Sequence, residues 1–212
     1  MCVTKEVSIS AFFICSLSCI YLYQRNNVND RWIAFIFGYF GIMQFLEYLM
    51  WTDQKCTGLN QTATDMAFIH NILQPIMSLL VAYVILKKVP NWSYLLLLLY
   101  IVYSLPKIYA AKKKNQCSKP CSKDNIGLSW EYTLIKDNPY IVWMIFTFAL
   151  AAPFLLMKKN GIIYASIILG TFAISHLLAL NRCPNISVSA PTGSWWCLMA
   201  TLGPLAAIYI NR

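Results

Sequence analysis

Seven apolar runs, each about as long as a membrane-spanning helix, constrain this chain more than any other feature. A helix that crosses the hydrocarbon core of a bilayer needs roughly 20 mostly apolar residues. Of the 212 residues, 58% are hydrophobic and 12% are charged, whereas a soluble domain carries about 25% charged residues. The sequence therefore predicts an all-α fold, a polytopic bundle of transmembrane helices that forms one domain over residues 1–212.

The runs also predict where the helices lie. The seven predicted helices cover residues 5–23, 31–51, 66–86, 92–110, 139–157, 161–180 and 193–210. The last run is the weakest, because Gly193, Gly203 and Pro204 interrupt it, so a bundle of six helices remains an alternative. Tryptophans flank the helix ends, as an aromatic belt at the membrane interface requires: Trp51, Trp92, Trp195 and Trp196.

Basic residues in the short connections predict the orientation. Those that follow the first, third, fifth and seventh helices fall on one side: Arg25, Arg31, Lys87, Lys88, Lys158, Lys159 and Arg212. Cytoplasmic loops carry the excess of Lys and Arg, so we expect the N-terminus outside or in a lumen and the C-terminus in the cytosol. The outer loop over residues 111–138 conflicts with this assignment because it is rich in lysine, although long loops obey the rule less strictly.

The net charge of +9 arises from these connections and does not indicate nucleic-acid binding. A nucleic-acid-binding protein needs a basic patch on a soluble face, and no stretch between the apolar runs is long enough to form a sizeable domain. We expect the lipid bilayer as the main partner, with basic side chains at the headgroups. The sequence leaves open the oligomeric state and the membrane in which the protein resides.

Sequons and cysteines support an outer location for the opposite side. The sequons predict glycosylation at Asn60 and Asn185. Cysteines on or near this side predict disulfides, because the compartment is oxidising: Cys56, Cys117, Cys121, Cys183 and Cys197. The pairing stays open, since these five and Cys2 allow fifteen connectivities. A zinc site is the alternative if this side is cytosolic.

Polar side chains recur inside three of the apolar runs. Six candidates for binding or transport come from the second, third and sixth runs: Gln44, Glu47, His70, Asn71, Gln74 and His176. Each predicted helix places its ionisable residue, Glu47, His70 or His176, four residues from the outer boundary, which is roughly 6 Å at 1.5 Å per residue. We therefore predict one polar layer in the outer leaflet, because ionisable residues inside a membrane usually pair or act on a ligand.

Pro75 lies next to this predicted layer. Proline has no backbone N–H, so the carbonyl of Asn71 loses its helical hydrogen bond and becomes available to a donor or a cation. Broken helices mark binding regions in many transporters. A packing kink relieved by a neighbouring hydroxyl is the alternative interpretation.

Three functions are compatible with such a layer. The preferred one is a site that binds or transports a proton, a cation or a small molecule, since histidine titrates near neutral pH. A structural membrane protein whose polar layer only packs helices is the second. A metal-dependent intramembrane enzyme is the third, with Glu47, His70 and His176 as two-histidine, one-carboxylate ligands.

Motifs that would define an activity are missing from the sequence. The last run contains no lysine, so no retinal is expected, and the sequence names no other cofactor. There is no Gly-x-Ser-x-Gly, no glycine-rich phosphate loop and no His-Glu-x-x-His. The sequence therefore assigns no catalytic residue and disfavours an enzyme.

Three of the runs, the second, the third and part of the seventh, carry a resemblance to a known family. Residues 40–44, with the sequence Phe-Gly-Ile-Met-Gln, precede His70-x-x-x-Gln74-Pro75, and residues 193–197 read Gly-Ser-Trp-Trp-Cys. This pattern resembles a family of multi-helix membrane proteins from bacteria, algae and large DNA viruses to which no activity is assigned. The resemblance covers about a third of the chain, and it implies a multi-pass membrane protein of the host or the virion.

Overall fold

Helices account for nearly all of the regular structure in the computed structural model, which describes residues 4–87, 89–111, 117–121, 127–130, 139–183 and 189–211. The helices are α1 (Lys5–Gln24), α2 (Val28–Thr52), α3 (Leu59–Leu86), α4 (Asn91–Ala111), α5 (Pro139–Ala151), the 3₁₀ helix η1 (Ala152–Leu156), α6 (Gly161–Arg182), α7 (Ser189–Thr201) and α8 (Gly203–Ile210). Two short strands, β1 (Lys119–Pro120) and β2 (Leu128–Ser129), pair antiparallel. The predicted all-α fold is confirmed.

Six helical segments within the described ranges are long and apolar enough to cross a membrane. They are Lys5–Gln24, Val28–Thr52, Leu59–Leu86, Asn91–Tyr109, Gly161–Asn181 and Pro191–Ile210. A seventh apolar segment, Ile141–Leu156, is shorter. The chain is therefore a multi-pass membrane protein.

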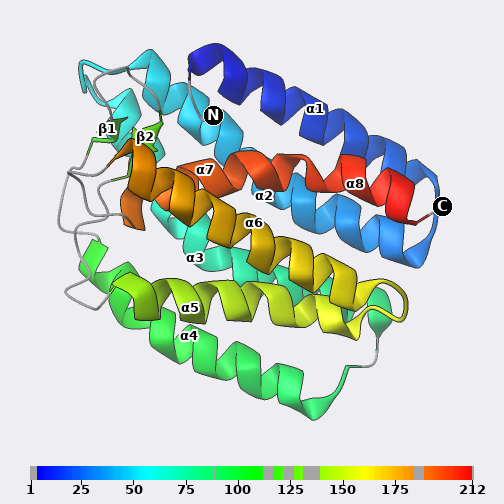
Figure 1. Ribbon diagram of the computed structural model, residues 1–212. Helices are drawn as coiled ribbons and strands as arrows, with labels where there is room; N and C mark the ends of the chain where they lie inside the picture. The colour runs from blue at the N-terminus through cyan, green and yellow to red at the C-terminus, as the bar shows by residue number, and fades with distance from the viewer. Residues whose placement is uncertain are drawn as a thin grey trace.

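The long helices lie side by side, and α2 runs through the middle of the bundle (Figure 1). It packs against α1, α3, α7 and α8. On one side, Gly41 of α2 lies directly against the Cys15 side chain of α1, so the two helices approach closely. On another, the Phe40 ring lies 5.7 Å from the Trp196 ring of α7. This central position explains why so many side chains of α2 are buried.

Trp195 and Trp196 correct one prediction, that of the aromatic belt. Both side chains are buried, and the Trp196 ring also packs edge-on against Phe146 and is tilted toward Phe172. They belong to the core because α7 begins before these residues and carries them inside the bundle. Trp92, in contrast, is exposed near the start of α4, as predicted.

The two ends of the bundle differ in chemistry. We call the end that carries β1 and β2 the disulfide end, because Cys56 is bonded to Cys117 there and Cys121 to Cys183. These four cysteines were predicted to form disulfides. The fifth, Cys197, is buried in α7 and belongs to neither disulfide. The C-terminus lies at the opposite end (Figure 1), which we call the clasp end.

Helix α3 begins at Leu59, seven residues before the predicted start. The added turns are polar, and their side chains find partners in the segment that carries β1. Asn60 is fully buried; its Nδ2 donates to the carbonyls of Met50 (2.9 Å) and Ser118 (2.9 Å). Its Oδ1 accepts from the Ser118 N–H (2.9 Å) and from the Thr64 hydroxyl (3.1 Å). The helix therefore extends because the tertiary structure satisfies its polar side chains.

This burial bears on the predicted glycan at Asn60. An acceptor amide must be accessible, whereas the Asn60 amide is enclosed and already makes two donor bonds. The folded conformation therefore disfavours Asn60 as a glycan acceptor. The second predicted acceptor, Asn185, lies outside the described residues.

Candidate functional site

The predicted polar layer separates into distinct groups of contacts. On α2, Gln44 Nε2 donates to Glu47 Oε2 at 2.9 Å, and both side chains are fully buried. On α6, His176 Nδ1 lies 3.2 Å from the Thr192 hydroxyl of α7. The remaining predicted residues, His70, Asn71 and Gln74, belong to α3. The sequence therefore identified buried polar residues, but it did not predict their grouping.

His70 is held at the interface between α2 and α3. Its ring stacks on Tyr39 of α2, with 4.2 Å between the ring centroids and 26° between the planes. The Tyr39 hydroxyl also donates to the backbone carbonyl of His70 at 3.5 Å. This contact places His70 level with Tyr39, eight residues from Glu47 along α2.

Depth in the bundle corrects the prediction of a single layer. The eight residues between Tyr39 and Glu47 correspond to roughly 12 Å along the helix axis at 1.5 Å per residue. Measured from Leu59, the observed start of α3, His70 is eleven residues deep, which is roughly 16 Å. His70 therefore lies near the middle of the bundle, whereas Glu47 lies near the disulfide end. The error arose because the sequence placed the start of α3 seven residues too late.

Metal binding was predicted to involve Glu47, His70 and His176 if a metal is bound at all. Within the described ranges, no group of three or more His, Cys, Asp or Glu side chains is close enough to hold a metal ion. The structure therefore does not bring these three residues together. The metal-enzyme hypothesis required all three side chains to surround one metal ion, and the structure does not support that arrangement.

A row of polar side chains on α3 forms the strongest candidate site. His70, Gln74 and Ser78 are four residues apart, so they lie on neighbouring turns of one helix face. All three are buried, and His70 Nε2, Gln74 Oε1 and Ser78 Oγ have no hydrogen-bond partner among the described residues. We call these three residues the polar stripe. Ser78 was missed from the sequence, although its spacing from Gln74 was a usable signal.

Asn71 and Pro75 lie beside the polar stripe. Gln74 Nε2 donates to Asn71 Oδ1 at 3.1 Å. Pro75 lies inside α3, as predicted, so the Asn71 carbonyl has no helical N–H donor four residues on. The site thus combines acceptors and a titratable imidazole along two turns of helix.

The first turns of α3, at the disulfide end, carry buried polar side chains that already have partners. At 100° per residue, Asn60 and Thr64 lie within roughly 40° of Ser78 but roughly 80° and 120° from His70 around the α3 axis. They hydrogen-bond to Ser118, whose hydroxyl lies 2.9 Å from that of Thr64. We call Asn60, Thr64 and Ser118 the plug, because they fasten the segment that carries β1 to the disulfide end of α3.

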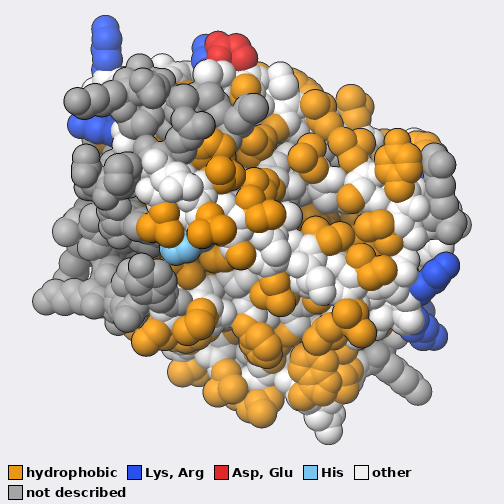
Figure 2. Space-filling view, viewed as in Figure 1, with side chains coloured by type: hydrophobic (Ala, Val, Ile, Leu, Met, Phe, Trp, Pro, Cys, Tyr) orange, Lys and Arg blue, Asp and Glu red, His pale blue; other side chains and the backbone are white. Residues whose placement is uncertain are grey.

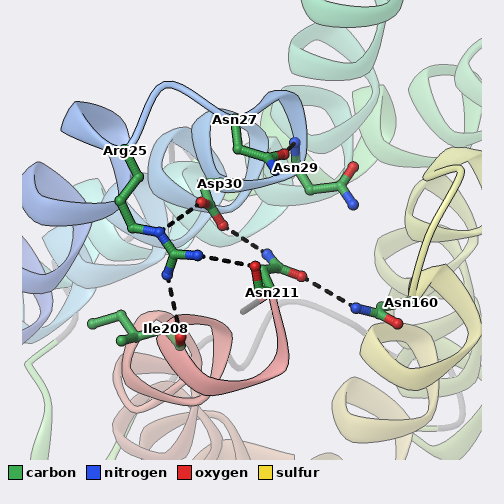
Figure 3. A network of polar contacts seen from close by, with 7 residues as sticks. All are labelled: Arg25, Asn27, Asn29, Asp30, Asn160, Ile208 and Asn211. Atoms are coloured by element: carbon green, nitrogen blue, oxygen red, sulfur yellow. Dashed lines mark hydrogen bonds and ion pairs between the residues drawn. The ribbon is translucent and has the colours of Figure 1, made fainter.

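A second polar cluster, at the clasp end, was missed from the sequence. Figure 3 shows Arg25, Asp30, Asn160 and Asn211 pointing toward one another from α1, α2, α6 and α8 or from the residues next to these helices. Arg25 Nε lies 3.1 Å from Asp30 Oδ2, and Asn211 Nδ2 donates to Asp30 Oδ1 at 2.8 Å. We call these four residues the clasp.

The clasp supplies hydrogen-bond donors to the backbone carbonyls at the end of α8. Arg25 donates to the carbonyls of Ile208 (3.1 Å) and Asn211 (2.9 Å), and Asn160 donates to the carbonyl of Ile210 (3.1 Å). A cation beside the carbonyl end of a helix is stabilising. The clasp therefore fastens the C-terminal helix, and its role is structural. Asp30 escaped notice because it lies one residue before the predicted helix.

The fold and these contacts define the class of protein, a multi-pass integral membrane protein built from an all-α bundle. Comparison of the chain with protein-family models, curated proteins and solved structures finds no match. The resemblance to the family from bacteria, algae and viruses therefore stays a prediction.

Proposed function

We propose that this membrane protein conducts protons through water held along the polar stripe of α3. One observation supports the proposal most strongly. Three buried polar atoms, His70 Nε2, Gln74 Oε1 and Ser78 Oγ, follow one another at intervals of one turn without a partner among the described residues. Buried polar groups in native proteins are almost always hydrogen-bonded to protein or water, and buried water typically satisfies such groups.

The chemistry of the stripe suits a proton better than a metal cation. An imidazole can accept a proton at one ring nitrogen while it donates one from the other, and amide and hydroxyl groups orient water on either side of it. A metal cation needs several oxygen or nitrogen ligands around one point, whereas the stripe extends over roughly 12 Å at 1.5 Å per residue. Glu47, which is buried nearer the disulfide end, would be the next group to exchange protons with the stripe.

The direct contacts of these helices favour a second function, in which the polar groups only pack helices. His70 of α3 stacks on Tyr39 of α2, and the Tyr39 hydroxyl donates to the His70 carbonyl. Hydrogen bonds between helices contribute about 0.6 kcal/mol each on average in membranes. The structural hypothesis predicts that variants of the stripe change stability without any effect on ion movement.

Proton flux into liposomes distinguishes the two functions. Purified protein is reconstituted with a pH-sensitive dye inside the vesicles, and a potassium diffusion potential drives proton entry. We expect His70→Ala to lower the flux at least tenfold, because the stripe then has no titratable group. His176→Ala is the matched control, since it removes the other intramembrane histidine, at the α6–α7 contact, and we expect nearly full flux.

Two results contradict proton conduction. One is a flux through the native protein equal to that of empty liposomes. The other is undiminished flux in His70→Ala protein that elutes as a single species in size-exclusion chromatography. Glu47→Gln completes the series. We expect a reduced flux, because the amide cannot exchange protons with the stripe.

A further inference from the structure

A groove of about 370 Å³ opens on the surface between α4 and the segment formed by α5 and η1. Its lining is apolar, with Trp92, Leu95 and Leu99 on one wall, Phe148 and Leu155 on the other, and Ala152 at the floor. Ala152 is buried, whereas the wall residues are largely exposed. The groove therefore has the size of a small-ligand site and suits a hydrocarbon chain.

The groove has a definite depth in the membrane. Trp92 is the second residue of α4, and Leu155 lies at the end of η1, so both mark the clasp end. From Trp92 to Leu99 the groove extends roughly 10 Å along α4 at 1.5 Å per residue. The hydrocarbon core of a bilayer is about 30 Å thick. The groove thus starts at the interface and ends within the leaflet on the clasp side.

Basic side chains lie at the interfacial end of the groove. Lys87, the residue after α3, precedes Trp92 by five residues, and Lys158 and Lys159 follow Leu155 by three and four. In Figure 2, apolar side chains cover the face formed by α4 and α5, and Lys or Arg side chains project near the turn before α6. None of these three lysines forms an ion pair with a described residue.

We propose that this groove binds one acyl chain of an anionic phospholipid whose phosphate contacts Lys87, Lys158 and Lys159. An amphiphile with a hydrocarbon tail and an anionic head matches both parts of the site. Basic pockets between transmembrane helices bind anionic headgroups in this way. The site is independent of the polar stripe and of proton conduction.

A second copy of the chain fits the same groove less well. In the common two-fold arrangement the same surface of both subunits meets. The lysines of the two copies would then face each other, and like charges across an interface are unfavourable. The charge pattern therefore favours a lipid.

Native mass spectrometry tests the lipid site on the full chain. Purified protein is mixed with phosphatidylglycerol or with phosphatidylcholine of the same acyl chains, and the retained lipid is counted. We expect at least fivefold greater retention of phosphatidylglycerol. The K158Q/K159Q variant should lose most of this preference, whereas K107Q, which removes a lysine near the other end of α4, should keep it.

A second pair of variants tests the groove itself. Ala152→Leu fills the floor and should abolish retention of phosphatidylglycerol, whereas Val102→Leu, on exposed α4 surface outside the groove, should not. If Ala152→Leu is not monodisperse, Leu95→Trp on the exposed wall replaces it. The proposal is overturned by equal retention of both lipids, by an unchanged preference in K158Q/K159Q, or by a native dimer that Ala152→Leu dissociates.

Discussion

Individual residues show how differently the bundle treats two fully buried carboxylates, those of Asp30 and Glu47. Asp30 has an arginine and an asparagine as partners, so its charge is neutralised and its role is structural. Glu47 is paired with the amide of Gln44, which leaves its charge uncompensated by that contact. A buried carboxylate that is held by a neutral amide is a candidate for proton exchange. The two environments therefore favour different roles.

Gly193 gives a stability prediction at the same scale. A Cβ at this position would collide with the buried ring of Trp130, whereas a Cβ on Gly170 would meet nothing within 4 Å. We expect Gly193→Ala to lower the free energy of unfolding by about 1–3 kcal/mol, the usual cost of overpacking a core.

Gly170→Ala is the matched control for that prediction. It should stabilise α6 by up to about 1 kcal/mol, because alanine is the better helix former. Chemical denaturation of both variants in detergent measures the two values. Equal stability of Gly193→Ala and the native protein would contradict the close contact with Trp130.

Among the helices, α3 has the largest effect on the composition and depth of the candidate site. It carries the polar stripe and two of the three plug residues, and its start is fixed by the turn that connects it to α2. In this turn the Asp53 carboxylate accepts from the N–H groups of Asn60 (3.0 Å), Thr57 (2.9 Å) and Gly58 (3.1 Å). Gly58, at φ +132°, adopts a conformation that other residues rarely reach. The turn therefore sets how deep the stripe lies.

Asp53 makes the stability of this turn depend on pH. The N–H donors, that of Asn60 first and that of Thr57 next, lower the pKa of the Asp53 carboxyl from 3.8 to about 2. A group whose pKa is lowered by folding stabilises the fold above its unfolded pKa and loses that effect as pH falls through the folded value. We expect the melting temperature of the native protein to fall between pH 4 and pH 2.

Two variants distinguish the contribution of Asp53 to the pH dependence of stability from that of other carboxylates. Asp53→Asn should melt at a lower temperature than the native protein at pH 7. Its melting temperature should also fall less on acidification. Asp65→Asn, which changes an exposed carboxylate of α3, should retain the loss of stability on acidification that Asp53 causes. Parallel profiles for Asp53→Asn and the native protein, followed by circular dichroism, would contradict this account.

The whole molecule is polarised between its ends. The disulfide end has two disulfides and the plug, whereas the clasp end has Arg31, Lys87, Lys158 and Lys159 without ion-pair partners among the described residues. Disulfides persist in oxidising compartments, and lysine and arginine accumulate on the cytosolic side. Both rules predict the same orientation, with the disulfide end outside or in a lumen.

Epitope tags at the two termini test this orientation. In intact cells we expect added protease to remove an N-terminal tag and to spare a C-terminal one, because the termini lie at opposite ends of the bundle (Figure 1). Permeabilised cells, in which both tags should be cleaved, provide the control. Loss of only the C-terminal tag from intact cells would reverse the assignment, and the lipid site would then face the outer leaflet.

The sequence by itself determined the class of fold and four of the buried polar residues, Gln44, Glu47, His70 and Gln74. Apolar runs of about 20 residues permit a helix and little else in a bilayer, because every backbone polar group must be satisfied internally. The same patterning identified Gln44, Glu47 and Gln74 as buried. Four of the predicted disulfide cysteines were identified because they flank helices on one side.

Only the tertiary structure decided which of these residues meet. The polar turns at the start of α3 became helix because Ser118, far along the chain, satisfies Asn60 and Thr64. Because α3 starts earlier than predicted, His70 lies level with Tyr39 and away from Glu47. Trp196 likewise lies in the core and not at the predicted membrane interface, because Phe40 and Phe146 pack against it. Contacts between distant segments are not encoded in local hydropathy, so the depth and grouping of the polar residues required the packed bundle.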